Sequence, residues 1–244
     1  MQPWSIDWGA PWFQPWRDPG ERVLACLNAG AAVSEALNAQ PGSPVRFVAQ
    51  TDLPAGTAYE RFIFEHRACP TRDNLHDFFN GLCWLRMPLA KRRLNELQAS
   101  QIARDGIVAS RGLVRDAITL FDENGALLDA PPPIWAALVE RDWQRLFVGL
   151  RPLWSQVRVR VFGHALLEKL AQPRKDLTAH VWAEPCPIGT LGETDTWLAA
   201  RCTAERLAAK PFTPLPVLGI PGWWPANQNF SWYQDSTVFR PRRR

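Results

Sequence analysis

The segment DNLHDFFNGLCWLRMP, residues 73–88, places three polar side chains in the middle of a run that is otherwise almost wholly apolar. The pattern predicts a short helix that is capped by Asp73 and stopped by the closing proline. Because a helix that is apolar nearly all the way round is normally buried, polar groups on it need partners inside the protein. The polar side chains His76, Asp77 and Asn80 therefore mark the first place where a functional site is expected.

The composition is that of a globular protein. The chain has 244 residues, of which 46% are apolar and 21% charged, close to the average for globular domains and unlike a disordered chain or a coiled coil. Its unusual features are 13 tryptophans and 22 prolines. Tryptophan buries a large area and proline shortens helices, so we expect long, well-packed irregular segments. No change of composition marks a linker, and a single globular domain over residues 1–244 is predicted.

The sequence indicates a cytoplasmic protein with no membrane anchor. Its apolar runs are too short to cross a bilayer, and its first 20 residues lack the basic and apolar regions of a secretion signal. The five cysteines are widely spaced and form no CxxC pair, which favours buried thiols.

The net charge of +4 is concentrated at the end of the chain, where four of the last five residues are arginine. A basic terminal tail is usually a solvated end. The 24 acidic residues are spread among 28 basic ones, and no nucleic-acid-binding module is visible. Nucleic-acid binding is therefore the weakest of the functions considered, and the oligomeric state is left open.

Tryptophan and proline gather at both ends of the chain. Residues 1–18 carry four tryptophans spaced four apart and interrupted by prolines, which predicts an extended arm held by tryptophan packing. Residues 211–244 hold six prolines and three tryptophans, which predicts an irregular segment that wraps the body and ends in the basic tail.

Between the ends, hydrophobic periodicity alternates between helix and strand. Helices are predicted over residues 21–39, 89–104, 131–147, 156–170 and 193–210. Strands are predicted over residues 45–50, 58–65, 117–121, 126–129 and 177–183. The expected fold is α+β: a helix-dominated single domain with a small antiparallel sheet and a long C-terminal wrap rich in tryptophan and proline.

Three local features shape this prediction. The Asn124-Gly125 pair is a strong hairpin signal and predicts a turn between the strands 117–121 and 126–129. Residues 156–161 fit a strand by their alternation as well as the first turns of a helix, and the helix is favoured. Lys91 and the two arginines after it are expected to face water.

Four blocks of sequence together resemble a bacterial family catalogued as domain of unknown function three thousand and twenty-five. The blocks are HDFFN at 76–80 with Pro88 and Lys91, RDAITLFDENG at 115–125, FGHALLEK at 162–169 and GIPGWWPAN at 219–227. They span about residues 60–240, most of the chain. The resemblance implies no established activity or cofactor, so function has to be argued from the residues.

Two predicted helices each offer a histidine with an oxygen-bearing side chain four residues later. His76 and Asn80 share one stripe with Asp77 beside it, and His164 and Glu168 project from one face of the second helix. If the two helices face each other, they could hold one divalent ion, either zinc, manganese or iron, with an open position for water or substrate.

The leading hypothesis is therefore a metal-dependent enzyme that acts on a small molecule, with hydrolysis as the favoured reaction. A metal-bound water has its pKa lowered to roughly 7 and becomes a nucleophile. Asp122 and Glu123 could add a carboxylate, although turn chemistry explains them more simply. The proposed ligands are His76, His164 and Glu168; Asp77 or Asp116 would orient them or act as a base, and Asn80 would polarise the substrate.

The alternative is a non-catalytic binding or scaffold protein in which the same side chains form a structural network. Leaving a buried polar group unpaired costs about 1–3 kcal/mol, so a network of His76, Asp77, Asp116 and His164 could exist only to hold helices in place. No HExxH, GxSxG or P-loop signature decides between the two. The open question is whether His76 faces His164 across a cavity or across the core.

Overall fold

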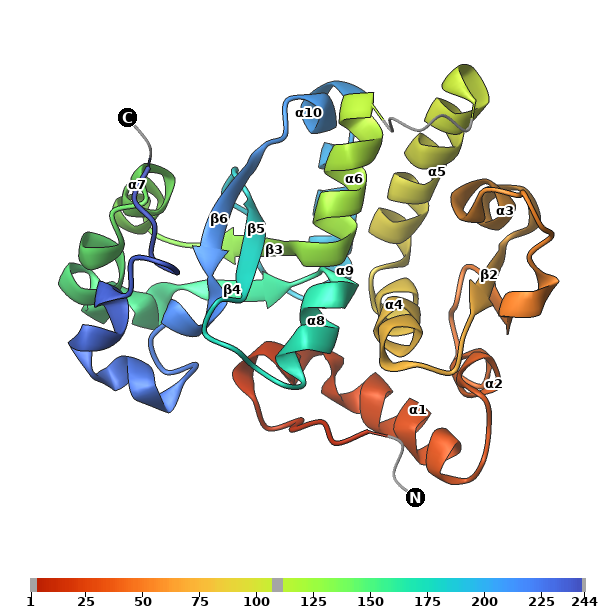
Figure 1. Cartoon of the computed structure of the whole chain (residues 1–244), viewed down its shortest axis with the longest axis horizontal. Helices are drawn as coiled ribbons and strands as arrows, with labels where there is room; N and C mark the ends of the chain where they lie inside the picture. The colour runs from red at the N-terminus through yellow and green to blue at the C-terminus, as the bar shows by residue number, and fades with distance from the viewer. Residues whose placement is uncertain (1–3, 107–111, 243–244) are drawn as a thin grey trace.

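The computed structural model describes residues 4–106 and 112–242, and Figure 1 shows how they are layered. A group of helices lies in the middle, with a two-stranded sheet on one side and a four-stranded sheet on the other. The fold is α+β and dominated by helices, as predicted. One hydrophobic core cluster contains side chains from Ala10 to Phe239, so segments near both ends of the chain pack into the same body.

The larger sheet is mixed, whereas the sequence analysis predicted an antiparallel one. Its strands are β3 Gly125–Asp129, β4 Arg158–Val161, β5 Thr178–Trp182 and β6 Phe212–Pro216, in the order β4-β3-β5-β6. β3 pairs antiparallel with β4 and parallel with β5, and β5 pairs antiparallel with β6. The parallel pair is possible because the long connection through β4 and α8, His164–Leu170, crosses over between its strands.

The smaller sheet pairs β1, Arg46–Ala49, parallel with β2, Ala68–Thr71. A parallel pair needs a crossover connection, and α3, Tyr59–His66, supplies it. The predicted strand over residues 58–65 is therefore wrong. Its aromatic composition favours a strand, but packing of the helix face that carries Phe62 and Ile63 into the interior decides for a helix.

Helix α4, Leu75–Arg86, confirms the helix predicted from the opening segment. Its cap is Asn74, whose side-chain oxygen accepts a hydrogen bond from the backbone N–H of Asp77 at 2.8 Å. The predicted cap, Asp73, instead accepts from the backbone N–H of Val33 at 2.8 Å and so ties α4 to the N-terminal helices.

Two long helices complete the central layer. Helix α5, Pro88–Asp105, begins at a proline, which fits the first turn of a helix. Helix α6, Gly112–Asn124, replaces the strand predicted over residues 117–121, and no hairpin forms at its end. Strand β3 starts directly at Gly125, where a Cβ atom would lie 2.3 Å from the carbonyl oxygen of Phe121. A glycine is therefore needed at residue 125 for the close approach of the backbone, and not for a hairpin turn.

Several other predicted helices change where tertiary packing overrides the local pattern. Residues 158–161 form β4 on the edge of the sheet, so the helix favoured there is wrong. The helix predicted over 21–39 is two helices, α1 Arg17–Asn28 and α2 Val33–Asn38, separated by Gly30 with φ of 98°. The last predicted helix is likewise divided, into α9 Leu191–Arg201 and α10 Ala204–Ala208.

The N-terminal arm is anchored by aromatic side chains, although it turns rather than extends. Pro11–Trp16 forms a 3-10 helix with Trp12, Phe13 and Trp16 buried. The ring of Phe13 stacks on that of Phe79 in α4, with centroids 5.5 Å apart.

The C-terminal segment also forms an ordered wrap. After β6 it continues in short 3-10 turns that lie near α7, Pro132–Glu140, at one end of the molecule (Figure 1). Trp143 donates its indole N–H to the carbonyl of Arg240 at 2.7 Å, which fixes the wrap to the body. Residues 1–3 of the predicted arm and 243–244 of the basic tail lie outside the described residues.

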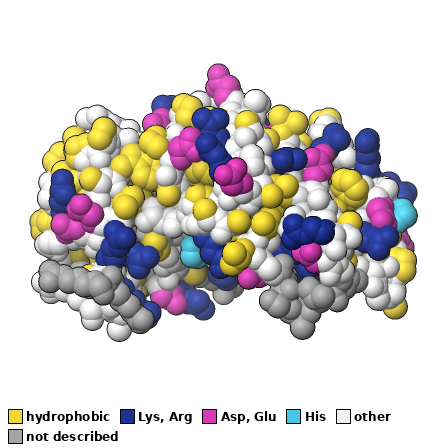
Figure 2. All heavy atoms as spheres, turned by 90° about the horizontal axis from the view of Figure 1, so that it is seen from above, with side chains coloured by type: hydrophobic (Ala, Val, Ile, Leu, Met, Phe, Trp, Pro, Cys, Tyr) yellow, Lys and Arg dark blue, Asp and Glu magenta, His cyan; other side chains and the backbone are white. Residues whose placement is uncertain are grey.

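Within residues 4–106 and 112–242, no helix combines the length and apolar character needed to cross a membrane. On the face shown in Figure 2, lysine and arginine side chains alternate with aspartate and glutamate. This face therefore has no continuous basic area of the kind that binds a nucleic-acid backbone.

Candidate functional site

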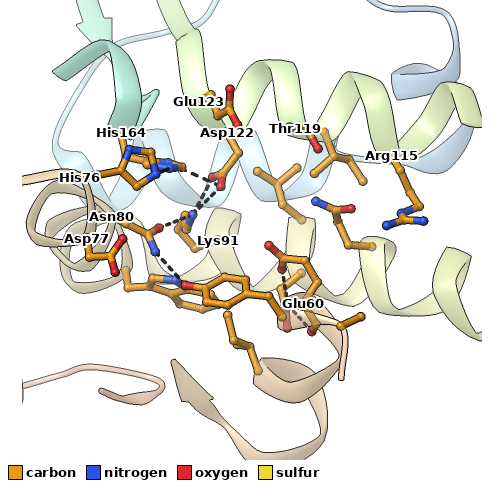
Figure 3. Close-up of a pocket in the computed structure, with 18 of the residues that line it drawn as sticks. Glu60, His76, Asp77, Asn80, Lys91, Arg115, Thr119, Asp122, Glu123 and His164 are labelled. Atoms are coloured by element: carbon orange, nitrogen blue, oxygen red, sulfur yellow. Dashed lines mark hydrogen bonds and ion pairs between the residues drawn. The ribbon is translucent and has the colours of Figure 1, made fainter. Parts of the chain in front are cut away.

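A cavity of about 640 Å³ lies among helices α3, α4, α5 and α6, and His164 of α8 lines it as well. Figure 3 shows that polar side chains from all of these helices point toward one another there. The cavity is large enough for a small molecule. Helix α4 forms part of its wall, since His76, Asp77 and Asn80 line the cavity.

Two histidines lie in direct contact at one end of the cavity. The Nε2 atoms of His76 and His164 are 3.1 Å apart, and the rings meet edge to face with centroids 4.6 Å apart. Glu168, one turn after His164 on α8, places Oε2 2.8 Å from Nδ1 of His76. The structure thus brings together the three residues that the sequence analysis proposed as metal ligands.

These three side chains form a row and do not surround a single point. Glu168 and His164 contact opposite nitrogens of the His76 ring, so one ion cannot be bound by all three in this arrangement. In the part of the chain that the structure describes, no group of three or more His, Cys, Asp or Glu side chains could hold a metal ion. Glu168 instead orients the His76 ring, as an outer carboxylate does.

A buried ion pair continues the row into the cavity. Lys91 donates to both carboxylate oxygens of Asp122, at 2.6 and 2.7 Å, and to Oδ1 of Asn80 at 2.9 Å. Lys91 is only 4% exposed, so the prediction that it faces water is wrong. The side chain points from α5 toward α4 and α6. Its charge can be buried there because each of the three ammonium protons has an acceptor.

The electrostatics keep this pair ionised. Burial opposes the charged form of Asp122, but the charge of Lys91 outweighs it and holds the pKa of Asp122 below its usual value. Burial also opposes the charged form of Lys91, yet Asp122 leaves its pKa raised. The two shifts agree in direction, as expected for partners that stabilise each other.

His164 has the opposite character. Burial lowers its pKa to about 3, although the charge of Asp122 works in the other direction. The imidazole is therefore neutral at ordinary pH. Its Nδ1 atom is buried and makes no hydrogen bond of good geometry with a described residue, although the backbone of Asp122 lies near the ring and Oδ2 of Asp122 is 3.6 Å away. That distance is too long for a good hydrogen bond, so the carboxylate of Asp122 and the ring of His164 are adjacent but not hydrogen-bonded.

A family model described as Protein of unknown function (DUF3025) matches residues 45–243 of the chain. The chain belongs to this family. The match includes every helix that lines the cavity, and it confirms the resemblance seen in the four sequence blocks. Comparisons with curated proteins and with solved structures found no match. Because the family carries no described activity, the site itself has to indicate what this DUF3025 protein does.

The three residues predicted to be catalytic have different positions in this DUF3025 chain. Asn80 lies in the cavity wall, where it accepts from Lys91 and donates from Nδ2 to the hydroxyl of Tyr59 at 3.2 Å. Asp77 also lines the cavity, but the guanidinium of Arg72 holds both of its oxygens, at 3.0 and 2.9 Å. Asp77 therefore connects the end of β2 to α4.

Asp116 is the predicted site residue that the structure places away from the others. It is exposed on α6 and does not line the cavity, so its assignment as an orienting group or base is corrected. Asp116 and Asp122 are six residues apart on α6. This separation corresponds to about one and two-thirds helical turns, so the two side chains lie on different faces of the helix. Asp122 occupies the place that the sequence analysis gave to Asp116.

Sequence reasoning missed three contributors to the cavity. Lys91 was assigned to the surface, Glu60 to a strand, and Arg115 to no role. Glu60 accepts from Nδ2 of Asn95 at 2.6 Å, and burial, followed by the charge of Asp122, raises its pKa. A helical wheel over residues 112–124 would have placed Arg115 and Asp122 on one stripe, but the strand prediction prevented that inference.

Proposed function

We propose that this protein is an enzyme that moves protons to and from a small polar molecule bound in the cavity. The observation that carries the proposal is the neutral, buried His164. Its Nε2 contacts His76, and its unpartnered Nδ1 faces Asp122 at the cavity wall. Glu168, His76, His164 and Asp122 then act as one proton path between the cavity and the protein surface.

The burial of charge supports a site over a purely structural network. Burying an ion pair such as Lys91 and Asp122 gives the fold little net stability, since apolar residues of similar volume often do as well or better. Perturbed titratable groups that converge in a cleft are typical of active sites. Here the buried pair, the neutral histidine and Asn80 all line the same cavity.

We propose the following placement of the protons, which satisfies both hydrogen bonds. With Nδ1–H of His76 donating to Glu168, Nε2 of His76 accepts from Nε2–H of His164, and Nδ1 of His164 is left unprotonated. A proton that reaches Nδ1 from the Asp122 side releases the Nε2 proton to His76. His164 is neutral before and after this transfer, which suits its lowered pKa.

His76 is the outlet of the path. Its side chain is 33% exposed, and the carboxylate of Glu168 stabilises the imidazolium that forms when the proton arrives. On the cavity side, a shift of about 0.7 Å would close the gap between Asp122 and His164 to hydrogen-bond length. Asp122 would then accept a proton from water or from a substrate group and pass it on.

Hydrolysis of a small polar ester, phosphoester or amide is the reaction class that we favour. It requires a water to be deprotonated beside the substrate and a positive group to stabilise the negative charge that develops. Asp122 and Lys91 lie next to each other in the cavity wall and could supply these two functions.

A screen against generic esters, phosphoesters and amides tests this function. We expect His164→Asn and His76→Asn to lower the rate on any substrate found by about 100-fold or more, because both interrupt proton transfer. Asp116→Asn is the matched control, since Asp116 is exposed on α6 outside the cavity, and it should retain full activity. Absence of turnover across the screen, or equal rates in all variants, would count against the proposal.

Stability separates the enzyme from a structural network. If the network exists only to hold helices, then His164→Asn should lower the free energy of unfolding with no activity to lose. If the site exists for function, replacing the ion pair by Lys91→Met with Asp122→Leu should leave stability unchanged or raise it by about 1–4 kcal/mol. Urea unfolding of both variants measures the difference.

A metal centre is the second candidate, favoured by one contact. The two Nε2 atoms are 3.1 Å apart, close enough for both to bind one ion, and each ring turns its Nδ1 toward a carboxylate. Water or substrate would complete the shell. Zinc or manganese that binds stoichiometrically to the wild-type protein but not to His76→Asn would support this centre. Full activity in protein stripped with a chelator would rule in favour of the metal-free proton path.

A further inference from the structure

We infer that the cavity has a second subsite, at Arg115, that binds the carboxylate or phosphate group of an elongated ligand. The inference rests on the proposed function only in that Asp122 marks the reacting end. Arg115 lines the cavity from α6, and Figure 3 shows it at the end away from the two histidines. Its guanidinium has no hydrogen bond or ion pair with any described residue, and its Nε atom is buried without a partner.

The other basic side chains of the cavity already have counter-charges. Lys91 is paired with Asp122, and Arg72 is paired with Asp77. Within the described residues, Arg115 is therefore the arginine or lysine of the cavity wall that is left without one. A guanidinium presents planar pairs of N–H donors that match a carboxylate or a phosphate, which makes an anionic group the ligand chemistry that fits.

Asp105 also feels the charge of Arg115, but it is exposed and pairs with Arg104. Glu60, which lines the cavity with Arg115, is the other acidic candidate to satisfy Arg115, and it is a poor one. The two side chains form no ion pair within 4.0 Å, although the charge of Arg115 influences Glu60. Glu60 is already held by Asn95, and its burial favours the protonated form. The charge of Arg115 is thus available to a ligand.

Helix geometry sets the length of that ligand. Arg115 and Asp122 are seven residues apart on one stripe of α6, which corresponds to about 10 Å along the helix axis. The cavity wall also includes the apolar side chains of Leu94, Ile102 and Ile118, the last of which lies between Arg115 and Asp122 on α6. We therefore expect a linear molecule with an anionic group at one end, an apolar middle and a polar reacting group at the other.

Binding of three matched probes tests the subsite without any need for turnover. The probes are 6-hydroxyhexanoate, 6-hydroxyhexyl phosphate and 1,6-hexanediol, which share a chain and differ in the terminal group. We expect calorimetry or ligand-observed NMR to show that the wild-type protein binds at least one of the two anions and binds the diol at least about tenfold more weakly. The better anion identifies whether the subsite prefers carboxylate or phosphate.

Variants of two arginines decide whether Arg115 is responsible. Arg115→Gln should weaken anion binding about tenfold or more, and Arg115→Lys should give an intermediate loss because it keeps the charge but not the planar donor pair. Arg61→Gln is the control of equal charge change, since Arg61 is exposed on α3 and pairs with Glu65 outside the cavity. It should bind like the wild type, and circular dichroism should show all three variants folded.

The outcomes distinguish this inference from the proposed function. Unchanged anion binding in Arg115→Gln, or no binding of either anion by the wild-type protein, overturns the subsite. His164→Asn should keep anion binding while it loses activity. If anions bind through Arg115 but the histidine variants alter no reaction, the subsite stands and the proton path fails.

Discussion

At the scale of single residues, His164 decides the character of the site. It is 6% exposed and in contact with a second histidine, and the negative charge of its neighbour Asp122 is already balanced by an ion pair with Lys91. Burial disfavours the protonated form of His164 more than the nearby carboxylate favours it, so the pKa of His164 falls to about 3. The side chain can accept a proton only by giving one away at its other nitrogen.

This lowered pKa predicts a pH dependence of folding. Between about pH 6.5 and pH 3, the unfolded chain binds a proton at His164 that the folded chain does not bind. Stability should therefore fall with decreasing pH across this range, by at most roughly 1.4 kcal/mol per pH unit from this residue. Urea unfolding at pH 7 and pH 5 should show a smaller pH effect in His164→Asn than in the wild type.

The control for this experiment is His66→Asn, because His66 is exposed at the end of α3. That variant should keep the wild-type pH dependence. If His164→Asn also keeps it, then His164 is protonated in the folded protein and the description of a neutral base is wrong.

At the scale of elements, the site depends on how closely α8 approaches α6. Gly163 precedes α8, and a Cβ atom there would lie 2.4 Å from the carbonyl oxygen of Glu123 and 2.5 Å from the backbone nitrogen of Asn124. The obstruction is backbone, which cannot move aside as a side chain can. The absence of a side chain at Gly163 therefore lets the end of α6 and the start of α8 bring Asp122 beside His164.

Gly163→Ala should consequently separate these elements. We expect it to lower the free energy of unfolding by about 1–3 kcal/mol or more, as overpacking does, and to shift the NMR signals of the His76 and His164 rings. The matched control is Gly149→Ala, because a Cβ atom there meets nothing within 4 Å. Equal stability of the two variants would show that α8 can retreat from α6 without cost.

At the scale of the whole molecule, the N-terminal segment belongs to the body of the protein although the family match begins at residue 45. Phe13 stacks on Phe79, and Trp8 lies against both Phe78 and Phe79, with centroids 6.4 Å from each. The opposite side of α4 carries His76 and Asn80 into the cavity. The arm thus covers the apolar face of the helix whose polar face forms the site.

A fragment of residues 45–244, which lacks the N-terminal segment, should therefore not reach the fold of the full chain. Loss of the N-terminal segment exposes Phe78 and Phe79, which are fully buried in the intact protein. We expect the fragment to lack a cooperative thermal transition and to bind a hydrophobic dye, because α4 loses one of its two packing surfaces. In the full chain, Phe13→Ala should cost about 3–5 kcal/mol. A cooperatively folded fragment would show that the arm is dispensable.

Local pattern was enough for features that depend on neighbours in sequence. The apolar run of residues 75–86 is too continuous for a surface helix, and the i, i+4 spacing of His164 and Glu168 puts both on one face, so a meeting of His76 with His164 was a reasonable prediction. Strands β1 and β5 were also found from their composition and alternation, whereas β3 was predicted from a hairpin signal at Asn124-Gly125 although no hairpin forms there. These properties do not depend on where the rest of the chain lies.

The sequence by itself determined the α+β class, the buried helix α4, the aromatic anchoring of both ends and the candidate histidines. Only the tertiary structure decided that residues 59–66 and 117–121 are helical, that Lys91 is inside and that Asp122 rather than Asp116 completes the row. The physical reason is that a side chain becomes buried or paired through partners distant in sequence. Lys91 can be interior only because Asp122, 31 residues later, and Asn80 from the preceding helix accept its protons.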